Sequence, residues 1–542
     1  MTSPIVSNPR RRDQRLAQRT RFASTKTNKR GNYTMAAPNQ LTIRLSQSDN
    51  VVVARVDIPA GTEISEEKIS CRSGIAFGHK VAASNIKAGQ PVKKYGQIIG
   101  FASQEIHPGE HVHTHNLSMG DFDRDYAFCA DAAPAAEAPA EPETFDGIVR
   151  SDGRVATRNY IGVISSVNCS ASVCRFIADA FRGEALREFP NIDGVVPITH
   201  GTGCGMAGQG EGFEYLLNTI GGYARHPNFG GVLLIGLGCE VMQIDSVLTG
   251  GDLAEGKLFH AMTIQDLGGI RSSVDKGTAL IREMLPELNR VQRQPVPADR
   301  LILGLQCGGS DGYSGITANP ALGVASDLLV RNGGTAVLGE TPEVYGAEHL
   351  LTRRAVSRQV GEKLIDRIQW WEKYTADQGG AMDNNPSPGN KAGGLTTILE
   401  KSLGAVAKGG STNMVDVVKY AQPVAARGFV FMDTPGHDPV SITGMVAGGA
   451  NIICFTTGRG SVYGCRPVPS IKLATNTAMY DRMQDDMDIN CGVTLDGDVS
   501  IEDLGEQIFQ QILDVASGKR SKSETFLMGD NEFIPWQLGA VM

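Results

Sequence analysis

Large aromatic side chains and long apolar runs are both scarce in this chain of 542 residues. It has 3 tryptophans and 18 phenylalanines against 65 glycines. No apolar run approaches the roughly 20 residues that a membrane-spanning helix needs, which excludes that class of membrane protein. The many glycines instead favour an α/β protein with tight loops between its strands and helices.

Several short motifs are also missing. None of the 10 cysteines forms a CxxC pair, so the usual signature of a structural zinc site is lacking. In a large chain without a secretory signal, these cysteines do not indicate a disulfide framework. No Walker loop is present, and no GxGxxG motif has an acidic residue about 20 residues further on, so nucleotide binding has little support.

Basic charge is sparse outside the N-terminus. The formal net charge is −8, although the first 35 residues hold nine basic side chains and one acid. The acidic remainder disfavours a nucleic-acid partner, and an anionic substrate needs a local positive pocket. Residues 1–40 predict a disordered basic arm, which either precedes a true start at Met35 or is a transit peptide. We expect a cytoplasmic protein, or an organellar one if the arm is a transit peptide.

Composition divides the rest of the chain into four parts. Residues 41–118 show short strands broken by glycine and proline turns, which predicts a small all-β domain. The Ala/Pro/Glu tract within residues 119–143 predicts a semi-rigid linker. Residues 144–378 and 379–542 alternate short apolar strands with helices, which predicts two α/β domains with mainly parallel sheets.

Glycine-rich loops follow several of the predicted strands. The strings "GTGCG", "GLGCE" and "QCGGSDG" place Cys204, Cys239 with Glu240, and Cys307 with Asp311 at strand ends. Parallel sheets collect ligands at the carboxyl ends of their strands. These cysteines are therefore interpreted as thiols near a site, although a small buried thiol is the commoner state of cysteine.

Two further loops carry a cation. "PSPGNKAGG" holds Lys391 and "TTGRG" holds Arg459. Glycine loops after strands present backbone N–H groups to carboxylates or phosphates, and arginine adds a bidentate grip. Each loop alone is typical of a structural turn with a solvated cation. Together, in an acidic chain, they favour a site for an anionic small molecule.

Histidines gather in one stretch of the predicted β domain. "GEHVHTHN" places His111, His113 and His115 at alternate positions, which lie on one face of a strand. Imidazoles bind divalent metals readily, so these histidines are candidate metal ligands. An exposed histidine cluster that binds no metal is an equally good interpretation. His79 in "FGHKVA" and His200 in "ITHGTGCG" lie beside glycines, although a single histidine is usually structural.

Taken together, these strings resemble one family, the altronate and galactarate dehydratases, which also includes sulfolactate sulfo-lyase. The resemblance covers nearly everything from about residue 41 to 542. It rests on "GHK" at 78–80, "GLGCE" at 236–240, "CGGSDGYSGITANP" at 307–320, "NPSPGNKAGG" at 385–394 and "FTTGRG" at 455–460. It implies an N-terminal SAF domain of β-clip-like fold, followed by α/β dehydratase domains.

The activity that this resemblance implies is a hydro-lyase reaction, in which a sugar acid loses water and becomes a 2-keto-3-deoxy acid. D-altronate is the expected substrate and galactarate is the alternative. The family's association with iron implies a divalent metal, with Fe²⁺ expected first and Mn²⁺ or Mg²⁺ next. We also expect a homodimer. A non-catalytic carbohydrate-binding protein is the alternative from a different functional class.

The same resemblance suggests a role for each candidate residue. The residues expected to be catalytic are His79 as the base, His200 as the partner acid, Lys80 and Cys204. Those expected to bind substrate are Cys307, Ser310, Asp311, Asn319, Asn390, Lys391 and Arg459. Those expected to ligate the metal are Glu240, Asp311, His111, His113 and His115. Such a site requires the SAF domain to close over strand ends of the α/β body.

Overall fold

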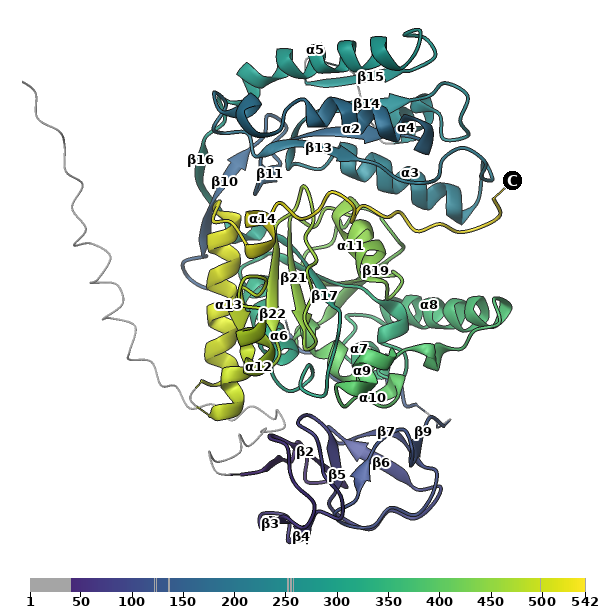
Figure 1. Ribbon diagram of the computed structural model, residues 1–542, viewed down its shortest axis with the longest axis vertical. Helices are drawn as coiled ribbons and strands as arrows, with labels where there is room; N and C mark the ends of the chain where they lie inside the picture. The colour runs from purple at the N-terminus through teal and green to yellow at the C-terminus, as the bar shows by residue number, and fades with distance from the viewer. Residues whose placement is uncertain are drawn as a thin grey trace, which may run out of the picture. The chain divides into compact units, whose positions relative to one another are not determined.

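The computed structural model describes residues 40–541, apart from residues 121, 123, 135, 136, 251, 252, 254, 255, 257 and 498 (Figure 1). The basic arm predicted over residues 1–40 lies outside the described residues, except for its last position. Within the described part of the chain, no helix has the length and apolar character needed to cross a membrane.

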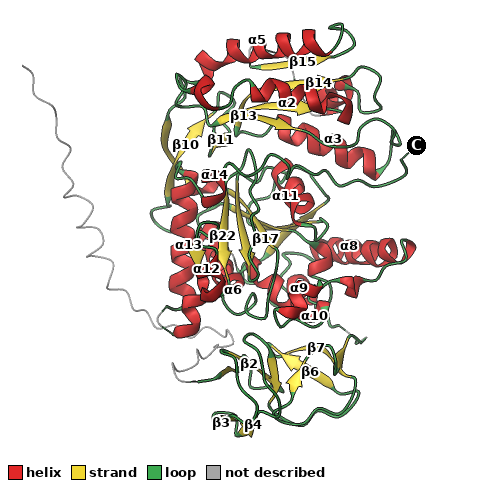
Figure 2. Cartoon of the chain, viewed as in Figure 1, coloured by secondary structure: helices red, strands yellow, loops and turns green. Residues whose placement is uncertain are grey.

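The N-terminal module consists of strands and loops (Figure 2). One antiparallel sheet has the order β1-β2-β5-β8, a second has the order β6-β7-β9, and β3 pairs with β4. The strands are β1 (Thr42–Ile43), β2 (Val51–Ala54), β3 (Glu63–Ile64), β4 (Ile69–Ser70), β5 (Lys80–Ala82), β6 (Pro91–Lys94), β7 (Gln97–Ala102), β8 (His111–Val112) and β9 (Leu117–Ser118). Val52 pairs with Val81 in the buried core, and the predicted all-β module is confirmed.

The segment after this module contains no helix or strand among its described residues before β10. It nevertheless lies against the C-terminal domain. Arg124 pairs with Glu348 at 2.9 Å, and the backbone N–H of Asp131 donates to the Arg353 carbonyl at 2.8 Å. The predicted linker is therefore bound to the body along part of its length.

A middle domain contains a four-stranded parallel sheet in the order β13-β12-β14-β15. Its strands are β12 (Tyr160–Ser165), β13 (Gly194–Ile198), β14 (Phe229–Gly236) and β15 (Phe259–Thr263). Its helices are η2 (Asn168–Ser170), α2 (Ala171–Asp179), η3 (Gly183–Leu186), α3 (Glu211–Ala224), α4 (Ile244–Gly250) and α5 (Ile270–Leu288). Ile161 packs with α2 and α5, whereas Ile164 packs with α3 on the other face (Figure 1). Because both faces are covered, the strands are continuous apolar runs.

A small antiparallel sheet forms where the chain enters and leaves the middle domain. Its order is β11-β10-β16. Its strands are β10 (Thr144–Val149), β11 (Val155–Ala156) and β16 (Arg293–Pro297), and η4 (Ala298–Arg300) follows. Pairing of β10 with β16 brings the two connections of the middle domain together.

The C-terminal domain is built on a seven-stranded parallel sheet in the order β19-β20-β18-β17-β21-β22-β23. Its strands are β17 (Ile302–Cys307), β18 (Thr335–Leu338), β19 (Met414–Val418), β20 (Phe429–Met432), β21 (Ile452–Thr457), β22 (Ser470–Ala474) and β23 (Ile489–Asn490). Its α-helices are α6 (Ala318–Arg331), α7 (His349–Thr352), α8 (Arg358–Asp377), α9 (Pro388–Ala392), α10 (Ile398–Ala405), α11 (Asp438–Ala447), α12 (Thr477–Arg482), α13 (Ile501–Ala516) and α14 (Lys522–Thr525). Short 3-10 helices are η5 (Thr341–Glu343), η6 (Met382–Asn384), η7 (Val406–Gly409) and η8 (Cys491–Asp496).

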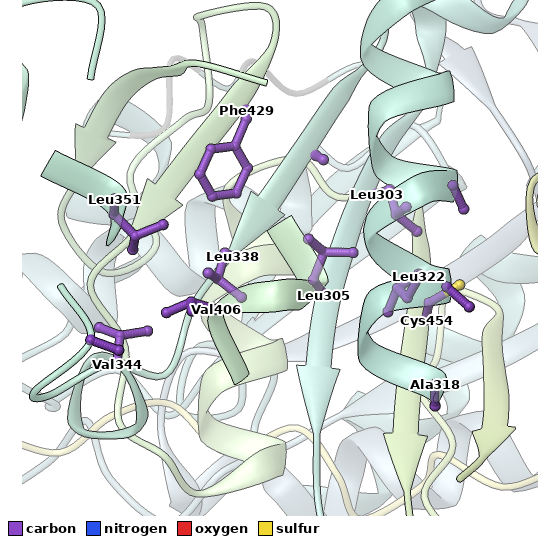
Figure 3. Close-up of a cluster of buried hydrophobic side chains, with 14 of the residues drawn as sticks. Leu303, Leu305, Ala318, Leu322, Leu338, Val344, Leu351, Val406, Phe429 and Cys454 are labelled. Atoms are coloured by element: carbon purple, nitrogen blue, oxygen red, sulfur yellow. The ribbon is translucent and has the colours of Figure 1, made fainter. Parts of the chain in front are cut away.

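The core of this domain packs helix α6 onto the central strands. Leu305 of β17 lies beside Leu338 of β18, and Leu303 of β17 belongs to the same buried cluster as Ala318 and Leu322 of α6 (Figure 3). This burial holds β17 rigidly, so the loop after its carboxyl end starts from a fixed position.

The expected division of the body at residue 378 differs from the sheet topology. Strands β17 and β18 precede that residue and the other five strands follow it, yet all seven pair in one sheet. The change from one parallel sheet to the next falls instead near residue 298. Local periodicity misses this boundary because it does not reveal which strands pair with each other.

The strand order reverses beside β17. Strands β18, β20 and β19 extend from one side of it, and β21, β22 and β23 extend from the other. In such sheets ligands bind outside the carboxyl ends of the two strands at the reversal. The loops after Cys307 and Thr457 are therefore the expected binding loops.

Candidate active site

Two glycine-rich loops meet at this reversal of strand order. One follows β17, and the other follows β21. The backbone N–H groups of Gly458 and Arg459 donate to the Gly309 carbonyl at 3.1 and 2.8 Å. Gly309 has a φ of +62°, a conformation that other residues rarely adopt. The glycine therefore allows the two loops to join directly.

Asp311 fixes the centre of these loops. Its carboxylate is 5% exposed and accepts hydrogen bonds from Ser314 Oγ at 3.0 Å, Thr475 Oγ1 at 2.9 Å and Asn476 Nδ2 at 3.1 Å. Burial raises the pKa of Asp311, and these hydrogen bonds oppose the shift. Its oxygens are satisfied inside the fold, so its observed role is to hold the loops. This differs from the metal ligand that the sequence predicts.

A third loop, with α9 at its centre, lies against the first. A capping box between Ser387 and Asn390 starts the helix. The Asn390 side chain also donates to the Ser310 carbonyl at 2.9 Å. Asn390 therefore positions the loop that carries Lys391 against the loop after β17.

The SAF module reaches these loops through its "GHK" segment. A methyl group at position 312 would lie 2.1 Å from the carbonyl oxygen of Gly78, and the Gly312 N–H donates to the Gly393 carbonyl at 2.8 Å. Nearby, the Tyr313 hydroxyl donates to the Ala54 carbonyl. Because the backbones are this close, position 312 requires glycine. The SAF module thus contacts a loop that follows the strand ends of the seven-stranded sheet.

Two cations near these loops have no partner within the described part of the chain. Arg459 is exposed and Lys391 is half-buried, and no described residue forms a hydrogen bond or ion pair with either side chain. Arg459 lies against the third loop, since a methyl group at position 393 would be 3.3 Å from its Cδ. Ser310 Oγ is buried and also lacks a described partner. Cations and an unpaired hydroxyl are groups that bind a hydroxy acid.

Three imidazoles converge beside the third loop. His79 Nδ1 lies 3.0 Å from His111 Nε2, and the ring of His113 lies against both. One ring nitrogen of each histidine lies within 4.8 Å of the other two. His79 Nε2 lies 3.3 Å from the Ala392 carbonyl, the usual contact that orients a metal-binding histidine. We call these three residues the histidine cluster.

The histidine cluster suits a divalent metal. His113 Nδ1 is buried and has no partner among the described residues. Burial is the main cause that lowers the pKa of His111 to about 4 and that of His113 to about 3. Neutral imidazoles are the form that binds metals. His115 is exposed and its ring lies 5.4 Å from that of His111, outside the cluster of three.

The structure revises the expected role of His79. The sequence predicts a general base, but one ring nitrogen faces His111 and the other faces the Ala392 carbonyl. Burial lowers the pKa of His79, to which nearby Lys80 also contributes. Both ring nitrogens therefore have protein neighbours, which does not favour His79 as the group that removes a proton from a substrate.

Lys80 is a structural contact between domains rather than a group at the substrate. Its fully buried ammonium donates to Glu400 at 2.9 Å and to the Gly394 carbonyl at 2.6 Å. Lys94 donates to the other oxygen of Glu400 at 3.0 Å. Burial alone would raise the pKa of Glu400, but the two lysines lower it to about 2. Glu400 on α10 is therefore a buried anion that ties two SAF lysines to the C-terminal domain.

A second cluster of ligand-type side chains lies beneath the loop after β17. The Cys307 Sγ is within 3.5 Å of carboxylate oxygens of both Glu340 and Glu343. Lys408 donates to Glu340 at 2.5 Å and Lys401 donates to Glu343 at 2.7 Å. Two ammonium groups already neutralise these carboxylates, so this cluster is a less suitable metal site than the histidines. Cys307 is 1% exposed and does not face a substrate.

The remaining predicted residues lie elsewhere. Asn319 is buried in α6, where it donates to the Gly404 carbonyl at 2.9 Å. His200, Cys204 and Glu240 belong to the loops of the middle domain. His200 Nε2 lies 3.1 Å from the Ser165 carbonyl, and burial lowers its pKa to about 4, so it is not a proton donor at neutral pH.

Glu240 accepts hydrogen bonds only within the middle domain. Its described partners are Ser166 Oγ at 2.8 Å and the backbone N–H groups of Leu237 at 3.1 Å and Gly238 at 2.6 Å. It shares no described contact with the histidine cluster, and the expected set of five metal ligands is therefore not brought together. Linear order cannot reveal this, because the middle domain and the SAF module each place their residues through their own sheets.

Sequence reasoning missed the buried charges around the site. These are Glu340, Glu343, Glu400, Lys401 and Lys408. A signal was present, because "EK" at 400–401 stands inside the apolar segment "TTILEKSLGA". Charged residues are rarely buried without partners, so such a pair in an apolar helix indicates an ionic contact.

Three segments of the chain match family models. Residues 40–120 match the altronate/galactarate dehydratase SAF domain, and residues 147–289 match the second domain of D-galactarate dehydratase/altronate hydrolase. Residues 298–541 match the C-terminal domain of D-galactarate/altronate dehydratase. These ranges agree with the sheet topology in starting the C-terminal domain near residue 298.

Full-length relatives agree with these matches. The chain is 39% identical over 492 residues to galactarate dehydratase (L-threo-forming) of Escherichia coli (strain K12), covering 89% of this chain and 94% of that protein. It is 35% identical over 487 residues to altronate dehydratase of Bacillus subtilis (strain 168), covering 88% and 95%. The beta subunit of (2R)-sulfolactate sulfo-lyase from Chromohalobacter salexigens is 29% identical over 399 residues, covering 72% and 96%. The chain therefore belongs to the altronate and galactarate dehydratase family, and it is a sugar-acid hydro-lyase with an N-terminal SAF domain.

Proposed function

We propose that this protein removes water from a six-carbon sugar acid at the histidine cluster and the loops beside it, with a divalent metal held by His79, His111 and His113. The observation that carries the proposal is the convergence of these three imidazoles beside the loop that carries Lys391. The buried, unpaired Nδ1 of His113 supports a metal at this place. Fe²⁺ is the expected ion, with Mn²⁺ or Mg²⁺ as alternatives.

The reaction breaks a C–H bond next to the carboxylate and the C–O bond on the neighbouring carbon. The proton and the hydroxyl leave together as water, and the remaining enol becomes the 2-keto-3-deoxy acid. A bound divalent ion supplies positive charge that stabilises the enediolate formed by proton removal. Arg459 and Lys391 bind the carboxylate groups of the substrate, and Ser310 Oγ binds a substrate hydroxyl.

His115 is the residue that we propose for proton removal. Its ring is exposed and lies 5.4 Å from that of His111, and no hydrogen bond to a described residue engages it. A base must lie near the metal without being consumed as a ligand. His115 meets both conditions, whereas His79 does not.

D-altronate is the proposed substrate, because "GEHVHTHN" and "VYGAEHLL" resemble altronate dehydratases. Galactarate is the second candidate, and a separate observation favours it. Galactarate carries a carboxylate at each end, and the site holds two cations without described partners, Arg459 and Lys391. The variant Lys391→Met can be assayed on both acids. If it loses turnover on only one of them, that acid is the substrate whose binding needs both cations.

The test measures keto-acid release from D-altronate, galactarate and other sugar acids, before and after chelation. We expect chelated enzyme to be inactive and to recover with Fe²⁺ or Mn²⁺. His79→Ala is expected to lose metal, whereas His115→Ala should keep metal and lose at least about 10² in kcat. Full activity after complete metal removal would contradict the metal-assisted proposal. Tight sugar-acid binding without turnover under every condition would favour the carbohydrate-binding alternative.

A further inference from the structure

Three cysteines of the middle domain lie at one edge of its parallel sheet. Cys169, Cys204 and Cys239 follow the carboxyl ends of β12, β13 and β14, which are adjacent strands. They are the exposed cysteines among the described residues, and none of the described cysteines forms a disulfide. Exposed free thiols at one sheet edge, in loops from three different strands, indicate a shared ligand rather than packing.

The loops that carry these cysteines are joined by backbone hydrogen bonds. The N–H of Asn168, next to Cys169, donates to the Thr202 carbonyl at 2.9 Å. The N–H of Met242 donates to the Gly203 carbonyl, next to Cys204, at 3.0 Å. The three cysteines are therefore held together by the fold and not by chance proximity of mobile loops.

Glycine allows the second loop to approach the first. Gly203 has a φ of +97°, and a methyl group there would lie 2.5 Å from the Ser166 carbonyl oxygen. Ser170, which follows Cys169, also donates its hydroxyl to the Ile235 carbonyl of β14 at 2.7 Å. All three strand ends are thus fixed relative to one another.

The surroundings of the thiols resemble the second layer of contacts around a metal site. Gln265 Nε2 donates to Cys239 Sγ at 3.4 Å, and hydrogen bonds to sulfur tune thiolate-bound metals. Burial raises the pKa of Cys169, and the neighbouring thiols Cys204 and Cys239 and the Glu240 carboxylate add to that shift. The thiols and the Glu240 carboxylate therefore lie close enough to interact with one another, which places them around one site.

The spacing of the thiols distinguishes between kinds of metal site. A tetrahedral ion with metal–sulfur bonds of about 2.3 Å holds its sulfurs about 3.8 Å apart. Among the described residues, the groups whose ligand atoms all lie within 4.8 Å of one another do not include these three cysteines. The three thiols, as they lie, are therefore too widely spaced for one ion to bind all of them, and a cluster of several irons reaches further than a single ion.

We propose that Cys169, Cys204 and Cys239 bind an iron–sulfur cluster through three thiolates, which leaves one iron with an open coordination position. A cavity of about 320 Å³ lies along the same segments. It is lined by Arg175 of α2, which begins just after Cys169, and by His200 of the loop that leads to Cys204.

The proposal is tested by metal and sulfide content, so it does not depend on dehydratase activity. The full chain is purified without oxygen, supplied with equal amounts of Fe²⁺ and Fe³⁺ and with sulfide, and freed of unbound ions. We expect about four irons and four sulfides per chain at this site, with an electron paramagnetic resonance signal after reduction. The variant His79→Ala should bind as much sulfide per chain as the wild type, because the histidine cluster is a separate site.

Each of Cys169→Ser, Cys204→Ser and Cys239→Ser is expected to lose the cluster and keep its melting temperature. Cys129→Ser, a half-buried cysteine outside the middle domain, is the matched control and should keep the cluster. Should a serine variant fail to fold, alkylation of the wild type provides the second measurement, since the loaded cluster should protect all three thiols. Iron or zinc bound without sulfide, or sulfide retained in the triple serine variant, would overturn the proposal.

Discussion

Single residues at this site divide into those that meet a ligand and those that hold others in place. Asp311 and Glu400 are buried carboxylates whose oxygens are satisfied by protein donors. Arg459 and Lys391 are cations with no partner among the described residues. The first pair therefore determines stability, and the second pair is available to determine substrate affinity.

Replacement of Arg459 should weaken substrate binding without unfolding the protein. Arg459→Lys keeps the charge but loses the planar fork that grips a carboxylate at two points. We expect KM to rise at least about tenfold, which corresponds to about 1.4 kcal/mol of binding. Arg427→Lys is the matched control, because this exposed arginine pairs with Asp299 at 2.8 Å and has no described contact with the site loops. Unaltered kinetics in both Arg459→Lys and Lys391→Met would remove these cations from the site.

Glu400 should make stability depend on acidic pH. The two lysines lower its pKa in the fold from the ordinary 4.5 to about 2. A lowered pKa contributes stability that is present above pH 4.5 and is lost as the pH falls towards 2, about 3 kcal/mol in all. Chemical denaturation of the wild type between these pH values should show this loss, and Glu400→Gln should lack it.

At neutral pH the same variant should be strongly destabilised. Removing one charge of a buried ionic group typically costs about 3–5 kcal/mol, because the partners stay buried and unpaired. Glu362→Gln breaks an exposed pair with Arg358 on α8 and is the control, with an expected loss below about 0.5 kcal/mol. Equal stability of the two variants would show that Glu400 does not carry the contact between the SAF module and α10.

Among the elements, the loops after the strands set the geometry of the site more than the helices do. The loops after β17 and β21 join through the carbonyl of Gly309, and the α9 loop is fixed by the side chain of Asn390. The SAF module meets them where Gly78 and Gly312 cross. Each junction uses backbone groups, so its geometry depends on close approach rather than on side-chain packing.

Gly312→Ala should push the SAF module away from the loop after β17. A methyl group there would lie 2.1 Å from the Gly78 carbonyl oxygen, so one backbone has to move. We expect a loss of about 1–3 kcal/mol, as in other overpacked sites, and weaker iron binding by the histidine cluster. The measurements are the melting temperature and an iron titration.

Gly389→Ala provides the comparison for this variant. A methyl group at Gly389 in α9 would lie 3.8 Å from its nearest neighbour, which is ordinary contact. Alanine also favours a helix over glycine. Similar behaviour of the two variants would contradict a special role for the crossing at Gly312.

Across the whole molecule, buried ionic contacts join domains that have separate sheets. Arg158, just before β12, is 1% exposed and donates to Glu524 of α14 at 2.6 and 2.8 Å. Lys80 and Lys94 make the corresponding contact between the SAF module and the C-terminal domain. The predicted homodimer would add a contact between chains and stays a prediction.

Glu524→Gln should reduce stability without changing catalysis. It leaves the Arg158 guanidinium buried with its charge unpaired, which typically costs about 3–5 kcal/mol. We expect a lower melting temperature and an unchanged KM, because neither side chain forms a described hydrogen bond or ion pair with Asp311, Lys391 or Arg459. Glu184→Gln, which removes an exposed pair with Arg187 in the middle domain, should change neither quantity. A raised KM in Glu524→Gln would show that domain contacts also set the site.

The sequence alone supplied the fold class, the family and the stretches that form the site. Short apolar runs ending in glycine predict parallel strands, and strings such as "CGGSDGYSGITANP" and "NPSPGNKAGG" predict the binding loops. His111 and His113 are predicted as metal ligands from alternate spacing on a strand, and the structure brings them together with His79. These features are local, because periodicity and turn chemistry act over a few residues.

Only the folded arrangement placed each residue in its role. It brought His111 and the Ala392 carbonyl against the two ring nitrogens of His79, which the sequence predicts as a general base. It assigned Glu240 to a different domain from the histidines and united β17 with β19 in one sheet across the expected boundary. Strand order and domain contacts depend on hydrogen bonds between residues far apart in the chain. A local sequence pattern does not predict which distant residues will form these bonds.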